Sequence, residues 1–119
     1  MDNKTLASVL EKNLEQVWNQ RNSEIRLQVI ESLYEEDCGL FHVNHHIKGY
    51  GAINESVSGV LAQMPGDFIF TRLSPVVINN DLGRLIWGVG PKGKPPVQTG
   101  MDIVIFEQGR IRSLYVFLD

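Results

Sequence analysis

Apolar residues in the first half of the chain repeat with the spacing of helical faces. An interval of three to four residues places them on one side of a helix, which is typical of helices that pack against a core. The three stripes run over residues 4–20, 23–36 and 52–64. Asn22 or Ser23 can cap the second helix with its side-chain oxygen, and Pro65 stops the third. The sequence therefore predicts three helices.

The second half of the chain is rich in β-favouring residues, and turn-forming residues divide it into four runs. These runs are residues 68–79, 84–89, 98–106 and 110–118. A shorter strand is expected at residues 38–43, followed by a loop at 44–48, and Ser74-Pro75 predicts a bend in the first long run. This order predicts one α+β domain over residues 1–119, in which an antiparallel meander curves around the helices and leaves a pocket at its open end.

Asp102 lies in the middle of the apolar run Gly100 to Phe106, where a buried carboxyl group is costly unless a hydrogen bond or a ligand compensates it. Alternation along a strand places Asp102 on the inner face with Val104. In an apolar pocket its carboxyl group would keep its proton to a higher pH and act as a hydrogen-bond donor. The alternative is a structural role, in which Asp102 binds a backbone amide or a basic residue.

His42 shares a strand face with Leu40 and Cys38, so it can point into the same pocket and act as a general base near neutral pH. Two alternatives remain at this stage. His42 can be purely structural, or it can bind Asp102, which would orient its ring. A metal site formed by His42 with His45 and His46 fits poorly, because adjacent histidines on a loop rarely reach one ion. We therefore expect no metal.

Two tryptophans, Trp18 and Trp87, can form walls of the pocket, and each offers an indole N–H as a donor. The apolar residues expected to line the pocket with them are Leu40, Val57, Leu85, Val104, Leu114, Val116 and Leu118. The outer face of the last two strands is also apolar. It carries Met101, Ile103, Ile105, Tyr115 and Phe117. Because a monomer seldom exposes such a patch, we expect a homodimer through the outer sheet face.

Composition narrows the possible functions further. The hydrophobic fraction of 43% and the charged fraction of 21% are ordinary for a globular protein, and no apolar run is long enough to span a membrane. The net charge is −3 and the basic residues are scattered, which argues against a nucleic-acid partner. A single cysteine, Cys38, and no secretory signal predict a cytoplasmic protein. Phosphate-binding loops and nucleophile elbows are absent from the sequence, so we expect neither a cofactor nor covalent catalysis.

Six short motifs occur in a characteristic order over nearly the whole chain. They are Val17-Trp18-Asn19, Leu33-Tyr34-Glu35-Glu36-Asp37, Lys48-Gly49-Tyr50-Gly51-Ala52-Ile53, Thr99-Gly100-Met101-Asp102-Ile103, Gly109-Arg110-Ile111-Arg112 and Val116-Phe117-Leu118-Asp119. Together they resemble the nuclear transport factor 2-like superfamily, and within it the SnoaL-like and ketosteroid-isomerase-like proteins. The resemblance implies a cystatin-like curved antiparallel sheet that forms a cone around three N-terminal helices. It also implies a small apolar ligand or substrate.

The resemblance also suggests roles for three residues. Asp102 lies where ketosteroid-isomerase-like enzymes have a protonated aspartic acid that donates to a developing oxyanion. His42 lies where those enzymes have a carboxylate base, and Trp18 lies where they have a tyrosine, so both depart from that pattern. One hypothesis is a cofactor-free acid–base enzyme of the isomerase, cyclase or hydrolase type, with His42 as base and Asp102 as donor. The other is a non-catalytic module that binds a small ligand or dimerises.

Overall fold

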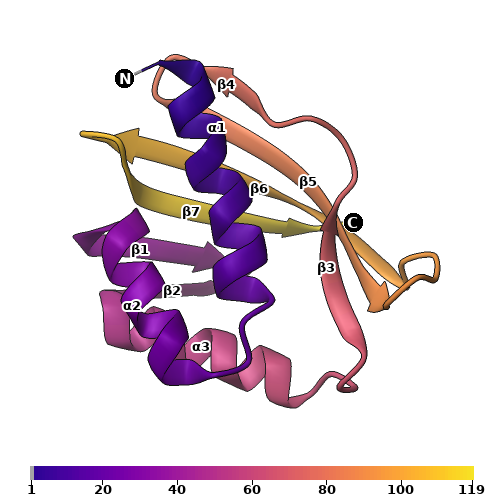
Figure 1. Ribbon diagram of the computed structural model, residues 1–119. Helices are drawn as coiled ribbons and strands as arrows, with labels where there is room; N and C mark the ends of the chain where they lie inside the picture. Colours follow the sequence, from indigo (N-terminus) through magenta and orange to yellow (C-terminus); the bar gives the residue numbers. More distant parts are fainter. Residues whose placement is uncertain (1) are drawn as a thin grey trace.

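Three α-helices and a seven-stranded sheet make up residues 2–119, which the computed structural model describes (Figure 1). The helical elements are α1 (Asn3–Lys12), the π-helical segment η1 (Asn13–Trp18), α2 (Ser23–Leu33) and α3 (Tyr50–Ala62). The strands are β1 (Tyr34–His42), β2 (His45–Lys48), β3 (Phe68–Arg72), β4 (Val77–Asn79), β5 (Leu82–Pro91), β6 (Gln98–Glu107) and β7 (Arg110–Leu118). The predicted fold class, α+β with a curved sheet around three helices, is confirmed.

The helices follow the predicted stripes, with differences at their ends. The first stripe forms α1 and then widens into η1 without a break in the chain. Asn22 caps α2 as expected, because its Oδ1 accepts hydrogen bonds from the backbone N–H groups of Glu24 and Ile25, each at 3.0 Å. The prediction that this helix continues to Glu36 is wrong. The backbone becomes extended at Tyr34 (φ −110°, ψ 153°), where β1 begins.

The sheet has the strand order β2-β1-β7-β6-β5-β3, and β4 pairs with β5 beside β3. Strands β5, β6 and β7 form the predicted antiparallel meander. The pairing of β1 with β7 is parallel, so the expectation of a wholly antiparallel sheet is wrong at this position. In Figure 1 the sheet curves around the helices, which cover one of its faces, and it does not close into a barrel.

The structure shows what becomes of one predicted loop and one predicted bend. Residues 44–48 are not a loop, because His45–Lys48 forms β2 and pairs antiparallel with β1. The turn between these strands places Asn44 at φ 64°, a conformation that asparagine tolerates well. The bend predicted at Ser74-Pro75 is confirmed, since the long run divides there into β3 and β4.

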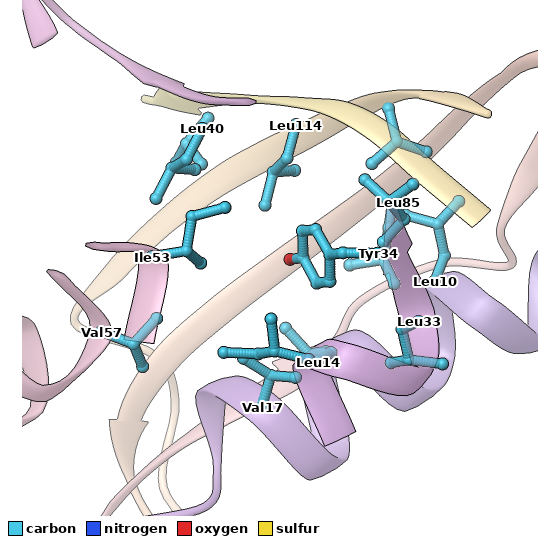
Figure 2. Close-up of a cluster of buried hydrophobic side chains, with 14 of the residues drawn as sticks. Leu10, Leu14, Val17, Leu33, Tyr34, Leu40, Ile53, Val57, Leu85 and Leu114 are labelled. Atoms are coloured by element: carbon cyan, nitrogen blue, oxygen red, sulfur yellow. The ribbon is translucent and has the colours of Figure 1, made fainter. Parts of the chain in front are cut away.

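The core lies between the helices and the inner face of the sheet. Figure 2 shows Tyr34 among side chains from both layers, including Leu14 of η1, Ile53 of α3 and Leu114 of β7. Arg26 of α2 is also buried, with 1% of its surface exposed. Its guanidinium donates hydrogen bonds to the Gln20 carbonyl, to Asn54 and to Ser58, so it ties α2 to α3. No helix within residues 2–119 is both long and apolar enough to cross a membrane.

Candidate functional site

A cavity of about 580 Å³ opens between the inner face of the sheet, η1 and α3. Small-molecule sites generally measure roughly 300–1,000 Å³ and combine apolar walls with a few polar groups. This cavity has the same character, because most of its wall consists of aliphatic and aromatic side chains. Apart from the two tryptophan indoles, its polar side chains are His42, His45, Ser56, Gln98 and Asp102. The strands and helices thus enclose a space of suitable size and chemistry for a small molecule.

The residues proposed from the sequence divide into two groups. Seven of them line the cavity, and these are Trp18, Leu40, His42, Trp87, Asp102, Val116 and Leu118. The other four, Val57, Leu85, Val104 and Leu114, lie in the core and not in the cavity wall. Figure 2 shows Leu85, Leu114 and Val57 within the side-chain cluster around Tyr34. Leu85, Val104 and Leu114 point inward from the sheet and are covered by the core, whereas Val57 belongs to α3 itself.

Sequence reasoning missed a further part of the wall. The residues not proposed beforehand are Leu14, His45, Ile47, Ser56, Val60, Met64, Phe68, Phe70, Val89, Val97 and Gln98. His45 and Ile47 were missed because their segment was interpreted as a loop. The available signal was Asn44, which favours a two-residue hairpin turn and would have placed His45 opposite His42.

Asp102 is held at the inner surface of β6 by a tryptophan from the neighbouring strand. Its side chain is 3% exposed, and its Oδ1 accepts a hydrogen bond from Trp87 Nε1 at 2.9 Å. Gly100 makes this contact possible, because a Cβ at that position would lie 2.3 Å from Trp87 Cζ2. The missing side chain leaves the space that the indole ring needs to lie against β6 and reach the carboxyl group.

The environment of Asp102 favours its neutral form. Burial raises the pKa of Asp102 to about 7, and the hydrogen bond from Trp87 opposes this shift by favouring the charged form. Within residues 2–119, neither a backbone amide, a basic residue nor His42 forms a hydrogen bond with the carboxyl group. The second oxygen, Oδ2, has no hydrogen-bond partner among these residues, while Asp102 forms part of the cavity wall. A ligand in the cavity can therefore meet this oxygen.

Asp102 and His42 lie in one row across three neighbouring strands. Asp102 pairs with Val116 in the β6–β7 ladder. The β1–β7 register pairs Phe41 with Tyr115, and continuing it by one residue brings His42 beside Val116. Strands are spaced by about 4.8 Å, so the two backbone positions are about 10 Å apart. This separation explains why His42 and Asp102 do not bind each other, and it leaves room for a ligand between them.

His42 and His45 lie at the solvent end of the cavity. Both are exposed residues, they are Cα partners in the β1–β2 hairpin, and both belong to the cavity wall. His46 points to the opposite face of the hairpin, where its ring stacks on Phe41 with centroids 4.2 Å apart. The three histidines therefore do not converge. Among the described residues, no group of three or more His, Cys, Asp or Glu side chains could hold a metal ion.

Behind the cavity wall lies a second buried polar pair. The Tyr34 hydroxyl donates a hydrogen bond to Asn13 Oδ1 at 2.5 Å, and both residues are fully buried. Burial, and next the charge of an ionised Asp102, raise the pKa of Tyr34 well above its ordinary value. Tyr34 is therefore a permanent donor. Asn13 Nδ2 has no hydrogen-bond partner within the described part of the chain.

Comparisons with known proteins agree with this architecture. No protein-family model and no curated protein sequence matches the chain. Among solved structures, it is similar to a proposed isomerase of the SnoaL-like family from Agrobacterium tumefaciens, with a TM-score of 0.88, 19% identity and 98% of both chains covered. A proposed ketosteroid isomerase from Kribbella flavida has a TM-score of 0.73 and 13% identity, over 98% of this chain and 78% of that one.

A nuclear transport factor 2-like protein from Cytophaga hutchinsonii has a TM-score of 0.68 and 15% identity, over 96% of this chain and 89% of that one. Identities of this size establish a shared fold and do not establish an activity. The chain therefore has the nuclear transport factor 2-like fold, in the form that SnoaL-like and ketosteroid-isomerase-like proteins share.

Proposed function

We propose that the cavity binds a small, largely apolar molecule that carries one hydrogen-bond acceptor, and that protonated Asp102 donates to this acceptor. The observation that carries the proposal is the unpartnered Oδ2 of Asp102, a residue in the wall of a largely apolar cavity. A neutral carboxylic acid has one O–H donor, whereas a carboxylate has none. Since its pKa is about 7, the donor form of Asp102 predominates below neutral pH.

The proposal predicts binding that depends both on the acceptor and on pH. Suitable probes are 2-tetralone, a bicyclic ketone, and tetralin, the matched hydrocarbon without the acceptor. We expect 2-tetralone to raise the melting temperature more than tetralin at pH 6, and to lose this advantage at pH 8, where Asp102 is ionised. Equal shifts by the ketone and the hydrocarbon at pH 6 would contradict the proposal.

Two substitutions of Asp102 test the assignment of the donor. Asp102→Asn keeps a donor that does not ionise, so its preference for the ketone should be the same at pH 6 and pH 8. Asp102→Leu has no donor and should bind the two probes equally. Asp67→Asn is the matched control, because Asp67 is exposed and lies outside the cavity wall. It should behave as the unsubstituted protein does.

A second candidate function is acid–base catalysis with His42 as the base. It is favoured by the row across β1, β7 and β6, in which a ligand bound to Asp102 would extend toward an imidazole with no hydrogen bond of its own in residues 2–119. A base at one end and a donor at the other suit proton removal next to a carbonyl group. Neighbours with the same fold that are described as proposed isomerases support a reaction of this kind.

Deuterium exchange separates catalysis from simple binding without requiring the natural substrate. In D2O, the protons next to the carbonyl group of 2-tetralone exchange slowly, and proton NMR follows their loss. If His42 is a base, the protein should accelerate this exchange above the buffer rate, and His42→Gln should abolish the acceleration. His46→Gln is the control, because His46 faces away from the cavity. Exchange at the buffer rate with bound ketone would favour the non-catalytic binding module.

We further propose that two copies associate through the outer face of the sheet. Two cross-strand pairs on this face are apolar: Met101 pairs with Phe117, and Ile103 with Tyr115. Phe117 is 53% exposed, and Tyr115 extends the surface by stacking on Phe41, with centroids 4.4 Å apart. Sedimentation of the intact protein should give a dimer, and Ile103→Lys should convert it to a monomer. A monomer at the highest soluble concentration would overturn this part of the proposal.

A further inference from the structure

The hairpin β1–β2 places two imidazoles side by side at the mouth of the cavity. His42 and His45 are directly opposite each other in the antiparallel ladder, a position in which Cβ atoms are about 5 Å apart. Both belong to the cavity wall, and the next inward pair of the ladder, Leu40 with Ile47, is apolar and also lines the cavity. On this face of the hairpin, an apolar pair is therefore followed directly by a pair of imidazoles.

The two imidazoles have no partner within residues 2–119. Neither forms a hydrogen bond or an ion pair there, since the side-chain ion pairs are Arg72 with Glu11 and Arg112 with Asp37. Asp102 is the acidic side chain of the cavity wall, and it lies two strands away from His42. Two adjacent imidazolium groups repel each other unless an anion lies between them, and charge-assisted hydrogen bonds to a carboxylate are among the strongest available.

We propose that His42 and His45 bind the carboxylate of a small, largely apolar acid, whose body fills the cavity and whose other end carries the acceptor that Asp102 meets. This inference rests on the proposed function, because it concerns the same cavity and names the class of its ligand. The body of the acid would lie over Leu40 and Val116 toward Asp102, along the row that spans about 10 Å. A third metal ligand is absent from this part of the described chain, so an anion fits the pair better than a cation does.

The position of the pair also fixes the orientation of the ligand. His42 and His45 are exposed, so a carboxylate bound there keeps contact with water, whereas burying it beside Asp102 would cost its hydration. The acidic group therefore stays at the mouth, and the uncharged end, which carries the acceptor for Asp102, enters first. A protonated His42 that holds a carboxylate cannot also accept a proton. A ligand of this class thus favours the binding function over catalysis by His42.

Binding of 2-naphthoic acid and of its matched amide, 2-naphthamide, tests the inference by calorimetry at pH 6. The two probes share shape and hydrocarbon area, and only the acid is ionised. We expect the acid to bind about tenfold more tightly, since a hydrogen bond to a charged group corresponds to about that factor. His42→Gln and His45→Gln should each reduce this preference, and the double variant should remove it. The affinity for the amide should change less than the affinity for the acid in all of them.

His46→Gln serves as the control, because it removes an imidazole from the same hairpin but from its other face. It should retain the full preference for the acid. If both probes bind equally to the unsubstituted protein, or if the double variant keeps the preference, the carboxylate site is refuted while the cavity proposal stands. If neither probe binds although 2-tetralone does, the carboxylate site is refuted and the cavity proposal stands.

Discussion

The substitution Asp102→Asn measures how the ionisation of the buried Asp102 carboxyl group changes the stability of the fold. The pKa of Asp102 in the folded protein is about 7, against an ordinary value of 3.8. The folded state therefore holds a proton that the unfolded chain has already lost between these two pH values. By linkage, the contribution of Asp102 to stability is complete below about pH 3.8, decreases as the pH rises, and is lost above pH 7.

The size of the effect follows from the same two values. Each pH unit between 3.8 and about 7 corresponds to about 1.4 kcal/mol, so the total decrease is about 4 kcal/mol. This is a large fraction of the free energy of unfolding of a small domain, which is typically about 5–15 kcal/mol. Asparagine cannot ionise, and its Oδ1 can still accept the hydrogen bond from Trp87 Nε1. The variant should therefore lack this loss.

Urea denaturation from pH 4 to pH 8 provides the assay, because urea adds no salt. We plot the free energy of unfolding of the wild type minus that of Asp102→Asn, so that all other titrating groups cancel. This difference should fall by about 4 kcal/mol, most steeply between pH 4.5 and 6.5. The control Asp67→Asn replaces an exposed carboxyl group outside the cavity wall and should not reproduce a fall of this size. A constant difference for Asp102→Asn would refute the argument, because Asp102 would then ionise as an exposed aspartate does.

Further predictions concern the groups around this carboxyl. Gly100→Ala should destabilise the fold by about 1–3 kcal/mol in urea denaturation, because the new Cβ would lie 2.3 Å from Trp87 Cζ2 and 2.6 Å from a backbone oxygen of β7. The control Gly59→Ala meets no atom within 4 Å and lies inside α3, so it should stabilise by about 0.5–1 kcal/mol, and equal effects of the two substitutions would contradict this explanation. Tyr34→Phe should cost about 1–3 kcal/mol by leaving both polar groups of Asn13 without a partner, whereas adding Asn13→Leu should recover most of that loss. Additive losses in this double-mutant cycle would show that the pair does not act as a unit.

Much of the fold could be predicted because the periodicity of apolar residues is set locally. The three helices and the meander β5–β6–β7 appear where the pattern indicates them. The parallel pairing of β1 with β7 could not be predicted this way, because nothing in β1 itself specifies which distant strand becomes its neighbour. Strand β2 was missed for a different reason. It has four residues, too few for alternation to distinguish a strand from a polar loop.

The sequence predicted which side chains point inward, but not which of these line the cavity and which lie in the core. Alternation correctly indicated that Asp102 and Leu114 point inward, yet Asp102 lines the cavity and Leu114 lies in the core. The difference depends on where the helices cross the sheet, which the strand sequence does not encode. The hydrogen bond from Trp87 to Asp102 could likewise not be predicted from the sequence, because it depends on strand register and on the space above Gly100. The cytoplasmic location and the lack of a nucleic-acid partner stay predictions.

The parallel contact between β1 and β7 has a consequence for how this protein folds. It joins the first strand of the chain to the last, and its ion pair between Asp37 and Arg112 spans 75 positions. Closing so long a loop is slow compared with forming the hairpins of the meander. During folding, β1 therefore cannot take its place in the sheet until β7 is available to pair with it. Until β7 links β1 to β6, nothing holds His42 and His45 in position relative to Asp102, so ligand binding should begin only after β7 has joined the sheet.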